Sequence, residues 1–142
     1  YIKKARNKHI LVEKPMVMSL KEALQIKPKK TFMVAHQYLY NDSIPKFKRA
    51  DITMRYPIWW EIAPHAFSFI DRKAEIYVTE GKKYLQFIFD GKLWKDMPKK
   101  EPLKVMLEHF IDCVKTGRKP LTDLKHGIRV IKVMELCQKL LI

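Results

Sequence analysis

Apolar residues follow two different periods along the chain, and the change comes near residue 101. Before that point they occur in short runs or alternate with polar residues, over lengths typical of strands. This pattern predicts strands at residues 9–12, 32–35, 51–55, 74–79 and 84–89. Asp90-Gly91 follows the last of these and is a strong signal for a hairpin turn.

Helical periodicity dominates the rest of the chain. Apolar residues between positions 103 and 114 recur at i, i+3, i+4, i+7, i+8 and i+11, and Gly117 is placed to end that helix. Thr122 or Asp123 can cap a second helix with one broad apolar face, and both helices are expected to pack on the sheet. Earlier in the chain, Ser19 and Glu22 form a capping box that predicts a short helix from residue 20 to about 26.

The composition indicates a folded domain. The 142 residues are 47% hydrophobic, which is enough apolar material for a core. Cys113 and Cys137 both fall in helical patterns, so we interpret them as small buried hydrophobic residues in a reducing cytoplasm. The five histidines and two cysteines show no metal-ligand spacing, and no run of residues indicates a membrane span or a signal peptide.

The chain is strongly basic, with 29 Lys and Arg against 15 Asp and Glu and a formal charge of +14. Such a charge attracts phosphate-bearing partners of several kinds, including nucleotides and nucleotide sugars. The lysines are scattered in twos and threes, without a stripe that would follow a nucleic-acid groove. A solvated basic surface is the simpler interpretation, and a nucleic-acid-binding domain ranks last among the hypotheses.

Lys14 is the first candidate for chemistry. It follows a predicted buried strand directly, and α/β folds bind ligands at the carboxyl ends of their strands. An ammonium there can donate to a substrate hydroxyl or a cofactor ribose, and Lys14-Pro15 is a bond at which a cis peptide is affordable. Taken alone, Glu13-Lys14-Pro15 is a weak signal, and an ordinary turn is the simpler interpretation.

A second candidate lies in the aromatic segment at residues 59–67. Glu61 and His65 are four residues apart, so on a helix they would share a face, and the carboxylate could orient the imidazole for proton transfer. Pro64 is tolerated best in a first turn, which would put Glu61 at or just before the helix start. Taken alone, a histidine near aromatic residues is more often an ordinary core or surface histidine.

Polar and aromatic residues also cluster at positions 36–41, directly after the second predicted strand. Such a group suits a pocket wall that reads hydroxyl groups, and it suits an ordinary capped loop as well. His9, His109 and His126 lie in strand or helix patterns and carry no catalytic hypothesis.

Six segments, taken in order, resemble the Gfo/Idh/MocA oxidoreductases. They are residues 8–16, 19–23, 33–41, 60–65, 75–81 and 109–123. The resemblance implies an NAD- or NADP-dependent dehydrogenase that moves hydride between a nicotinamide and a sugar or nucleotide sugar. It also implies an α/β fold in which residues 1–36 are the end of a dinucleotide-binding Rossmann domain. Residues 37–142 would form an α+β substrate domain with an open, mostly antiparallel sheet and helices on one face.

The resemblance assigns roles to individual residues. Lys14 and His65 would be catalytic, and Glu13, Lys14 and Pro15 would shape the nicotinamide site. The segments that approach the substrate contain Gln37, Tyr40, Asn41, Glu61 and His65. Two departures affect this assignment: Glu61 stands where aspartate is common, and Leu39 stands where a basic residue is frequent.

The chain also lacks parts of that pattern. No GxGxxG is present, and few residues separate the motifs where the family sheet needs several strands. We therefore expect the ordered pieces of a longer, cytoplasmic enzyme that binds no metal, membrane or nucleic acid and forms a homo-oligomer through its open sheet. The alternative is a non-enzymatic sugar-binding or regulatory remnant that has lost the cofactor domain.

Overall fold

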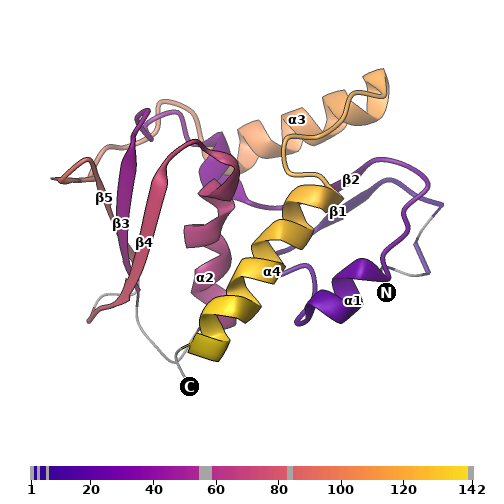
Figure 1. Ribbon diagram of the computed structural model, residues 1–142. Helices are drawn as coiled ribbons and strands as arrows, with labels where there is room; N and C mark the ends of the chain where they lie inside the picture. The colour runs from indigo at the N-terminus through magenta and orange to yellow at the C-terminus, as the bar shows by residue number, and fades with distance from the viewer. Residues whose placement is uncertain (1, 3, 6, 55–58, 83–84, 141–142) are drawn as a thin grey trace.

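The chain folds as a mixed α/β structure built on two sheets (Figure 1). The computed structural model describes residues 2, 4, 5, 7–54, 59–82 and 85–140. Its elements, in chain order, are β1 (Ile10–Val12), α1 (Leu20–Leu24), β2 (Phe32–Val34), the 3-10 helix η1 (Gln37–Tyr40), β3 (Arg49–Met54), α2 (Trp59–Phe67), the 3-10 helix η2 (Ser68–Asp71), β4 (Glu75–Glu80), β5 (Leu85–Phe89), β6 (Lys92–Leu93), α3 (Pro102–Thr116) and α4 (Leu124–Leu140).

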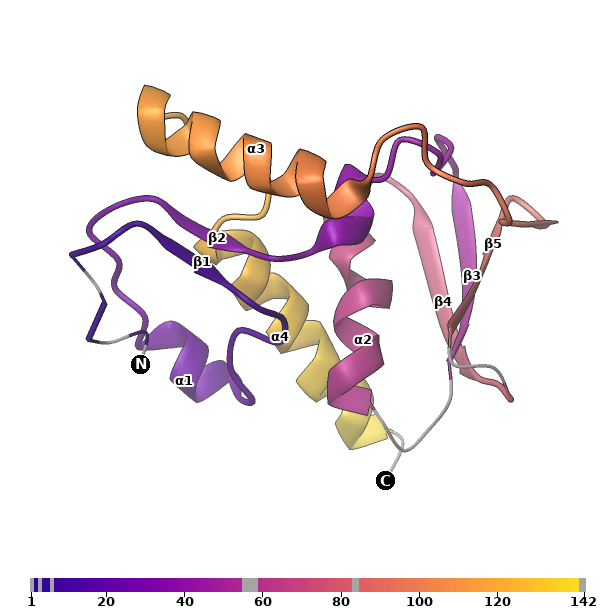
Figure 2. The same ribbon diagram turned by 180° about the vertical axis from the view of Figure 1, so that it is seen from behind.

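The first sheet is a parallel pair of strands, β1 and β2, with Ile10 opposite Phe32. Both faces of β2 are buried, as expected for a parallel strand with helices on each side. Phe32 and Val34 belong to the main core, while Met33 packs in a smaller core with Met106 of α3. In Figures 1 and 2, α3 lies on one side of the pair, and α1 and α4 lie on the other.

The second sheet has four strands in the order β4-β3-β5-β6. β3 pairs parallel with β4 and antiparallel with β5, and β5 pairs antiparallel with β6. Along β3, Ala50, Ile52 and Met54 are buried and the residues between them are not, so the alternation read from the sequence is present. The expected α/β class is confirmed, and the sheet is mixed, with one parallel and two antiparallel pairings.

The turn predicted at Asp90-Gly91 joins β5 to β6. Both residues have positive φ, 48° and 79°, the pattern of a type I′ turn, which glycine adopts without strain. The Asp90 carboxylate also accepts hydrogen bonds from the backbone N–H groups of Lys48 and Arg49. This turn therefore fixes the start of β3 as well as the hairpin.

The packing of the C-terminal helices differs from the prediction. Helix α2 contacts β3 and α4, whereas α3 contacts η1 and α4 contacts α1, α2, β2 and η2. Figure 2 shows α2 between the four-stranded sheet and α4. The expectation that α3 and α4 both pack on this sheet was wrong, because α4 packs against the parallel pair and α2, and α3 packs Met106 against Met33 of β2. Leu103, Leu107 and Ile111 of the apolar stripe predicted for α3 are exposed.

The position of Pro64 in its helix also differs from the prediction. Helix α2 begins at Trp59, so Pro64 lies inside the helix and Glu61 lies after its start. A proline in a helix interior removes one hydrogen bond and usually costs about 3 kcal/mol, so surrounding contacts must offset it. Those contacts are extensive, since Ile62, Ala63 and Ala66 are fully buried.

Helix termini follow their predicted caps closely. The Ser19 hydroxyl accepts from the N–H of Glu22, and α1 ends at Leu24, two residues before the predicted end. Gly117, with φ of 72°, ends α3. Arg55 and Tyr84, which were included in predicted strands, lie outside the described residues. No helix in the described part of the chain is long and apolar enough to cross a bilayer.

Candidate active site

Lys14 lies at the carboxyl end of β1, and the Lys14-Pro15 peptide bond is cis. Its side chain is half-buried and reaches α2, where the Nζ atom donates a 2.7 Å hydrogen bond to the backbone carbonyl of Glu61. The two residues are 47 positions apart in the sequence. The lysine therefore meets the same helix that carries His65, one turn before that residue.

His65 is buried, with 7% of its surface exposed. Burial, and then the positive charge of Lys14, lower the pKa of its imidazole from 6.5 to about 4. The imidazole is therefore neutral at pH 7. Its Nδ1 atom is buried without a hydrogen-bond partner.

The structure does not bring the Glu61 carboxylate into this arrangement. Glu61 is exposed, and its contribution to the site is the backbone carbonyl that accepts from Lys14. Burial and the charge of Lys14 lower the pKa of His65, and the Glu61 carboxylate does not contribute to this shift. The predicted orienting role of this carboxylate thus has no support in the geometry.

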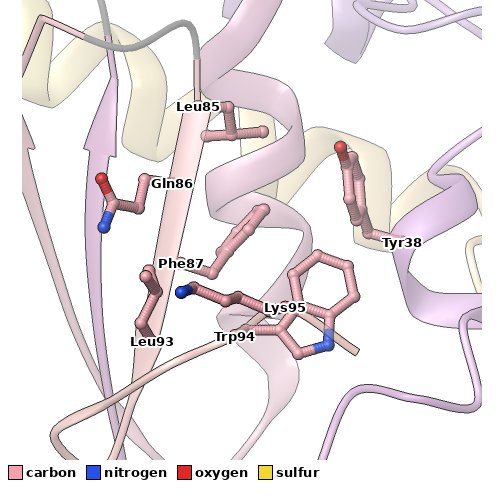
Figure 3. A pocket seen from close by; sticks show the side chains of 7 residues that line it. All are labelled: Tyr38, Leu85, Gln86, Phe87, Leu93, Trp94 and Lys95. Atoms are coloured by element: carbon pink, nitrogen blue, oxygen red, sulfur yellow. The ribbon is translucent and has the colours of Figure 1, made fainter. Parts of the chain in front are cut away.

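Tyr38 forms the wall next to His65. The two rings meet edge to face with centroids 4.8 Å apart. Tyr38 also lines a pocket of about 270 Å³, together with Leu85, Gln86, Phe87, Leu93, Trp94 and Lys95. Figure 3 shows Phe87 and Trp94 pointing toward Tyr38, and their ring centroids lie 5.3 and 6.3 Å from that of Tyr38, so the three rings pack on one another. An aromatic recess thus adjoins the imidazole.

The predicted substrate residues of the 36–41 segment separate in the structure. Gln37 is half-buried at the start of η1. Tyr40 points into the interior, where its hydroxyl lies 3.3 Å from Thr122 Oγ1 and its burial raises its pKa to about 12. The Asn41 side chain accepts hydrogen bonds from the N–H and hydroxyl of Ser43. Neither Tyr40 nor Asn41 is directed at Lys14 and His65 by these contacts.

Glu13 and Pro15 flank Lys14 as the sequence requires. Glu13 is exposed and Pro15 is half-buried. Both lie where the β1-β2 pair ends, which is the edge at which open α/β sheets bind ligands. Their assignment to a nicotinamide site stays a prediction.

A buried polar network lies behind the site and was missed at the sequence level. His36, at the end of β2, and His126, in the first turn of α4, are 2% and 1% exposed. Their rings meet edge to face with centroids 5.1 Å apart. His126 Nδ1 lies 2.7 Å from Asp71 Oδ2, and the same carboxylate accepts from Arg129.

A signal for this network was present in the sequence. His126, Val130 and Met134 are spaced by four residues, so the histidine falls on the apolar face of its helix. Gly127 follows it, and a Cβ atom at that position would lie 2.8 Å from Val34 Cγ2. The glycine thus lets α4 approach β2 closely enough to bring His126 to His36. A polar residue on a buried face next to a glycine is the pattern that could have identified it.

Comparison with solved structures shows which proteins share this fold. UDP-N-acetylglucosamine 3-dehydrogenase GnnA from Acidithiobacillus ferrooxidans aligns with a TM-score of 0.61 at 11% identity, over 90% of this chain and 68% of that chain. The protein yvaA from Bacillus subtilis, named as an oxidoreductase, aligns with a TM-score of 0.64 at 12% identity, over 93% of this chain and 70% of that chain. A protein from Magnetospirillum magnetotacticum, also named as an oxidoreductase, aligns with a TM-score of 0.61 at 16% identity, over 91% of this chain and 72% of that chain.

Sequence comparison gives no further assignment. No protein-family model matches the chain, and no curated protein matches it. At 11–16% identity, the structural likeness establishes the fold. The chain therefore has the fold of these oxidoreductases, and its chemistry has to be argued from its own residues.

Proposed function

We propose that this chain carries the catalytic lysine and histidine of a nicotinamide-dependent oxidoreductase that acts on a hydroxyl or carbonyl carbon of a sugar or nucleotide sugar. The observation that carries the proposal is the meeting of Lys14 with the helix turn of His65. The contact joins segments 47 residues apart, and an aromatic recess lies beside it. The shared fold with dehydrogenases supports the same conclusion.

Lys14 would stabilise negative charge on the reacting oxygen. An ammonium has three donors, and the Glu61 carbonyl uses one of them. The others can donate to a substrate hydroxyl and to a cofactor ribose. Because the site is partly buried, such a charge-assisted hydrogen bond is stronger than it would be in water.

His65 would accept the hydroxyl proton. Its pKa of about 4 keeps the ring neutral at pH 7, so a lone pair is free. A hydroxyl becomes strongly acidic as the hydride leaves its carbon, so even a weak base can take the proton at that stage. The positive charge of Lys14 lowers the basicity of His65, and negative charge developing on the substrate would raise it again.

The residues present fit the reactive end of a nicotinamide cofactor. When bound, the nicotinamide supplies or accepts the hydride. Glu13, Lys14 and Pro15 would hold this end, since they follow β1 and Lys14 has donors to spare. The four glycines of the chain form no GxGxxG, so these residues account for the nicotinamide end of NAD or NADP and not for its pyrophosphate.

The substrate would lie between His65 and the aromatic recess. The C–H face of a sugar ring packs well on an aromatic ring, and Tyr38 offers one directly beside His65. A volume of about 270 Å³ suits a single ring. Gln37 remains a candidate for binding a substrate hydroxyl. Tyr40 and Asn41 would contribute indirectly, because their contacts with Thr122 and Ser43 hold the conformation of residues 36–41.

The proposal is tested by cofactor binding and by turnover. We expect NADH or NADPH to bind, as measured by nucleotide fluorescence, and a panel of sugars and nucleotide sugars to yield a substrate. Lys14→Met and His65→Gln should each lower turnover by about 100-fold or more, which is much more than they lower cofactor affinity. Lys27→Met, at an exposed lysine, is the matched control.

Two outcomes would contradict the proposal. Turnover that survives both substitutions would remove the site assignment. A chain that binds sugars but neither dinucleotide would instead be the non-enzymatic sugar-binding form of this fold.

A further inference from the structure

We propose that the solvent-facing side of α4 binds the phosphate backbone of duplex nucleic acid without reading its sequence. The proposal goes beyond the oxidoreductase function and does not depend on it. It replaces the expectation that the chain binds no nucleic acid, because the helix gathers several of the apparently scattered lysines into one line.

The line consists of four cations and one leucine, which we call the α4 stripe: Lys125, Arg129, Lys132, Leu136 and Lys139. They recur at i, i+4, i+7, i+11 and i+14, and all five are exposed. Since each residue turns an α-helix by about 100°, the five positions fall within an arc of about 80° and extend over about 21 Å. In Figure 1, α4 crosses the near side of the molecule, with α2 on one side of it and α1 on the other.

Carboxylates beside the stripe are bound to other groups. Glu135 is the only acidic residue of α4, and its Oε1 atom accepts a 2.5 Å hydrogen bond from the backbone N–H of Leu20, at the start of α1. Asp123, just before the helix, pairs with Lys119. In the part of the chain that the structure describes, no carboxylate forms an ion pair with the three lysines of the stripe. These lysines are therefore available to an anion from outside.

Arg129 differs from the three lysines because it binds the Asp71 carboxylate through two nitrogens. Its side chain is still 47% exposed. Asp71 also contacts His126 Nδ1, so this carboxylate is engaged by two neighbours. The arginine therefore contributes a fixed cation to the middle of the stripe, with part of its charge offset by Asp71.

The side chains of the stripe favour a phosphate backbone over other anionic surfaces. A protein partner needs an apolar centre to its interface, and a membrane-bound helix inserts an apolar face. Leu136 is the only apolar residue on the stripe, because the apolar face of α4, with Val130, Ile131 and Met134, is buried. The stripe also has no aromatic ring on which unpaired bases could stack, which favours a duplex over a single strand.

The dimensions also suit a duplex. One strand carries a phosphate about every 3.4 Å along the axis, so a stripe of about 21 Å lies along about six base pairs. Cations that meet phosphates without reaching base edges position a protein on the duplex and carry no sequence information. We therefore expect binding that depends strongly on salt and not on base sequence.

Fluorescence anisotropy with a labelled duplex DNA of mixed sequence measures this binding. Four phosphate contacts give a slope of about −3.6 in log K against log salt, so the affinity of the parent chain should fall about 100-fold between about 50 and 200 mM salt. The variant Lys125→Gln/Lys132→Gln/Lys139→Gln should bind about 100-fold or more weakly at low salt and reduce the slope by about 2.7, or about 0.9 for each lysine. Glutamine is as good a helix former as lysine, so the helix is kept.

The matched control is Lys46→Gln/Lys92→Gln/Lys100→Gln, at three exposed lysines outside α4. Each triple variant replaces three lysines, so each lowers the formal charge from +14 to +11. The control should keep the parental slope and an affinity within about threefold, because salt screens charges that do not touch the backbone. A second duplex of different base composition should bind the parent chain equally well.

Three outcomes would overturn the proposal, provided that urea unfolding shows both variants to be folded in the assay. The first is a parent chain that does not bind the duplex at low salt. The second is an equal loss of affinity in the two triple variants, which would assign the binding to net charge. The third is parental binding to polyglutamate or to phosphatidylserine vesicles that is as tight as binding to the duplex and is lost in the same variant. None of these outcomes involves Lys14 or His65, so the proposed function would stand in each case.

Discussion

Acid should destabilise this chain well above the pH at which its carboxylates protonate. The pKa values of His36 and His65 are lowered by burial, to about 3 and about 4, against 6.5 in an unfolded chain. Below pH 6.5 the unfolded chain therefore binds protons that the folded chain does not. The stability that these histidines confer is present above pH 6.5 and is lost as the pH falls toward 4 and 3.

The size of the loss follows from those values. Between pH 7 and pH 5, each of the two histidines should lower the free energy of unfolding by about 2 kcal/mol, or about 4 kcal/mol together. Asp71 contributes little to the loss of stability between pH 7 and pH 5. Its pKa is 3.8 in the unfolded chain and about 2 in the folded chain, so its contribution is lost only at lower pH. Domains of this size are stable by about 5–15 kcal/mol, so the chain should be only marginally folded at pH 5.

Urea unfolding at pH 7, 6 and 5 measures this loss directly. His36→Gln removes one of the titrating groups, so its loss between pH 7 and 5 should be about 2 kcal/mol smaller than that of the parent, whatever its stability at pH 7. His9→Gln, at an exposed site, should leave the slope unchanged. A His36→Gln chain with the parental slope, together with a His36 resonance titrating near 6.5 by NMR, would refute the reasoning.

Three further predictions concern packing and assembly. Gly127→Ala should lower the free energy of unfolding by about 1–2 kcal/mol in urea, because the added Cβ would lie 2.7 Å from Met16 Sδ and 2.8 Å from Val34 Cγ2, and this clash outweighs the gain in helix propensity. Thr122→Val should cost about 1–3 kcal/mol by thermal or urea unfolding, because the buried Thr122 hydroxyl donates to the Val34 carbonyl at 2.6 Å. If copies associate through the open face of the sheet, Tyr77→Glu should shift sedimentation toward monomer, since Tyr77 is 45% exposed there; an unchanged sedimentation coefficient would exclude that face.

Elements with a local signal were predictable from the sequence. The Ser19 cap, the Asp90-Gly91 turn and the Gly117 end of α3 each depend on a few neighbouring residues, and each occurs in the structure. The alternation along β3 likewise reports which of its faces is buried. In these cases the physics is local, so one stretch of sequence contains all of it.

Other features depend on segments that meet only in the folded chain. Nothing near His126 indicates that Asp71 will bind it, because 55 residues separate them. Tyr38 and Tyr40 belong to the same turn of η1, yet Tyr38 contacts His65 and Tyr40 is buried against Thr122. The direction of each side chain is set by where η1 sits between α2 and α3. A site assembled from four elements is therefore visible in the sequence only as separate candidates.

Pro64 lies in α2 next to the contact between Lys14 and that helix. Its ring leaves the preceding turn of α2 without one backbone N–H, which weakens the helix around residue 60. Lys14 donates to the carbonyl of Glu61 in this same turn. The proline thus lies where an outside cation takes part in the hydrogen bonding of the helix, and the contact holds that cation one turn from His65. The carbonyl that loses its helical donor is that of Trp60, and Lys14 binds the carbonyl of the next residue, so the proline weakens the turn beside the contact and the lysine adds an outside donor to it.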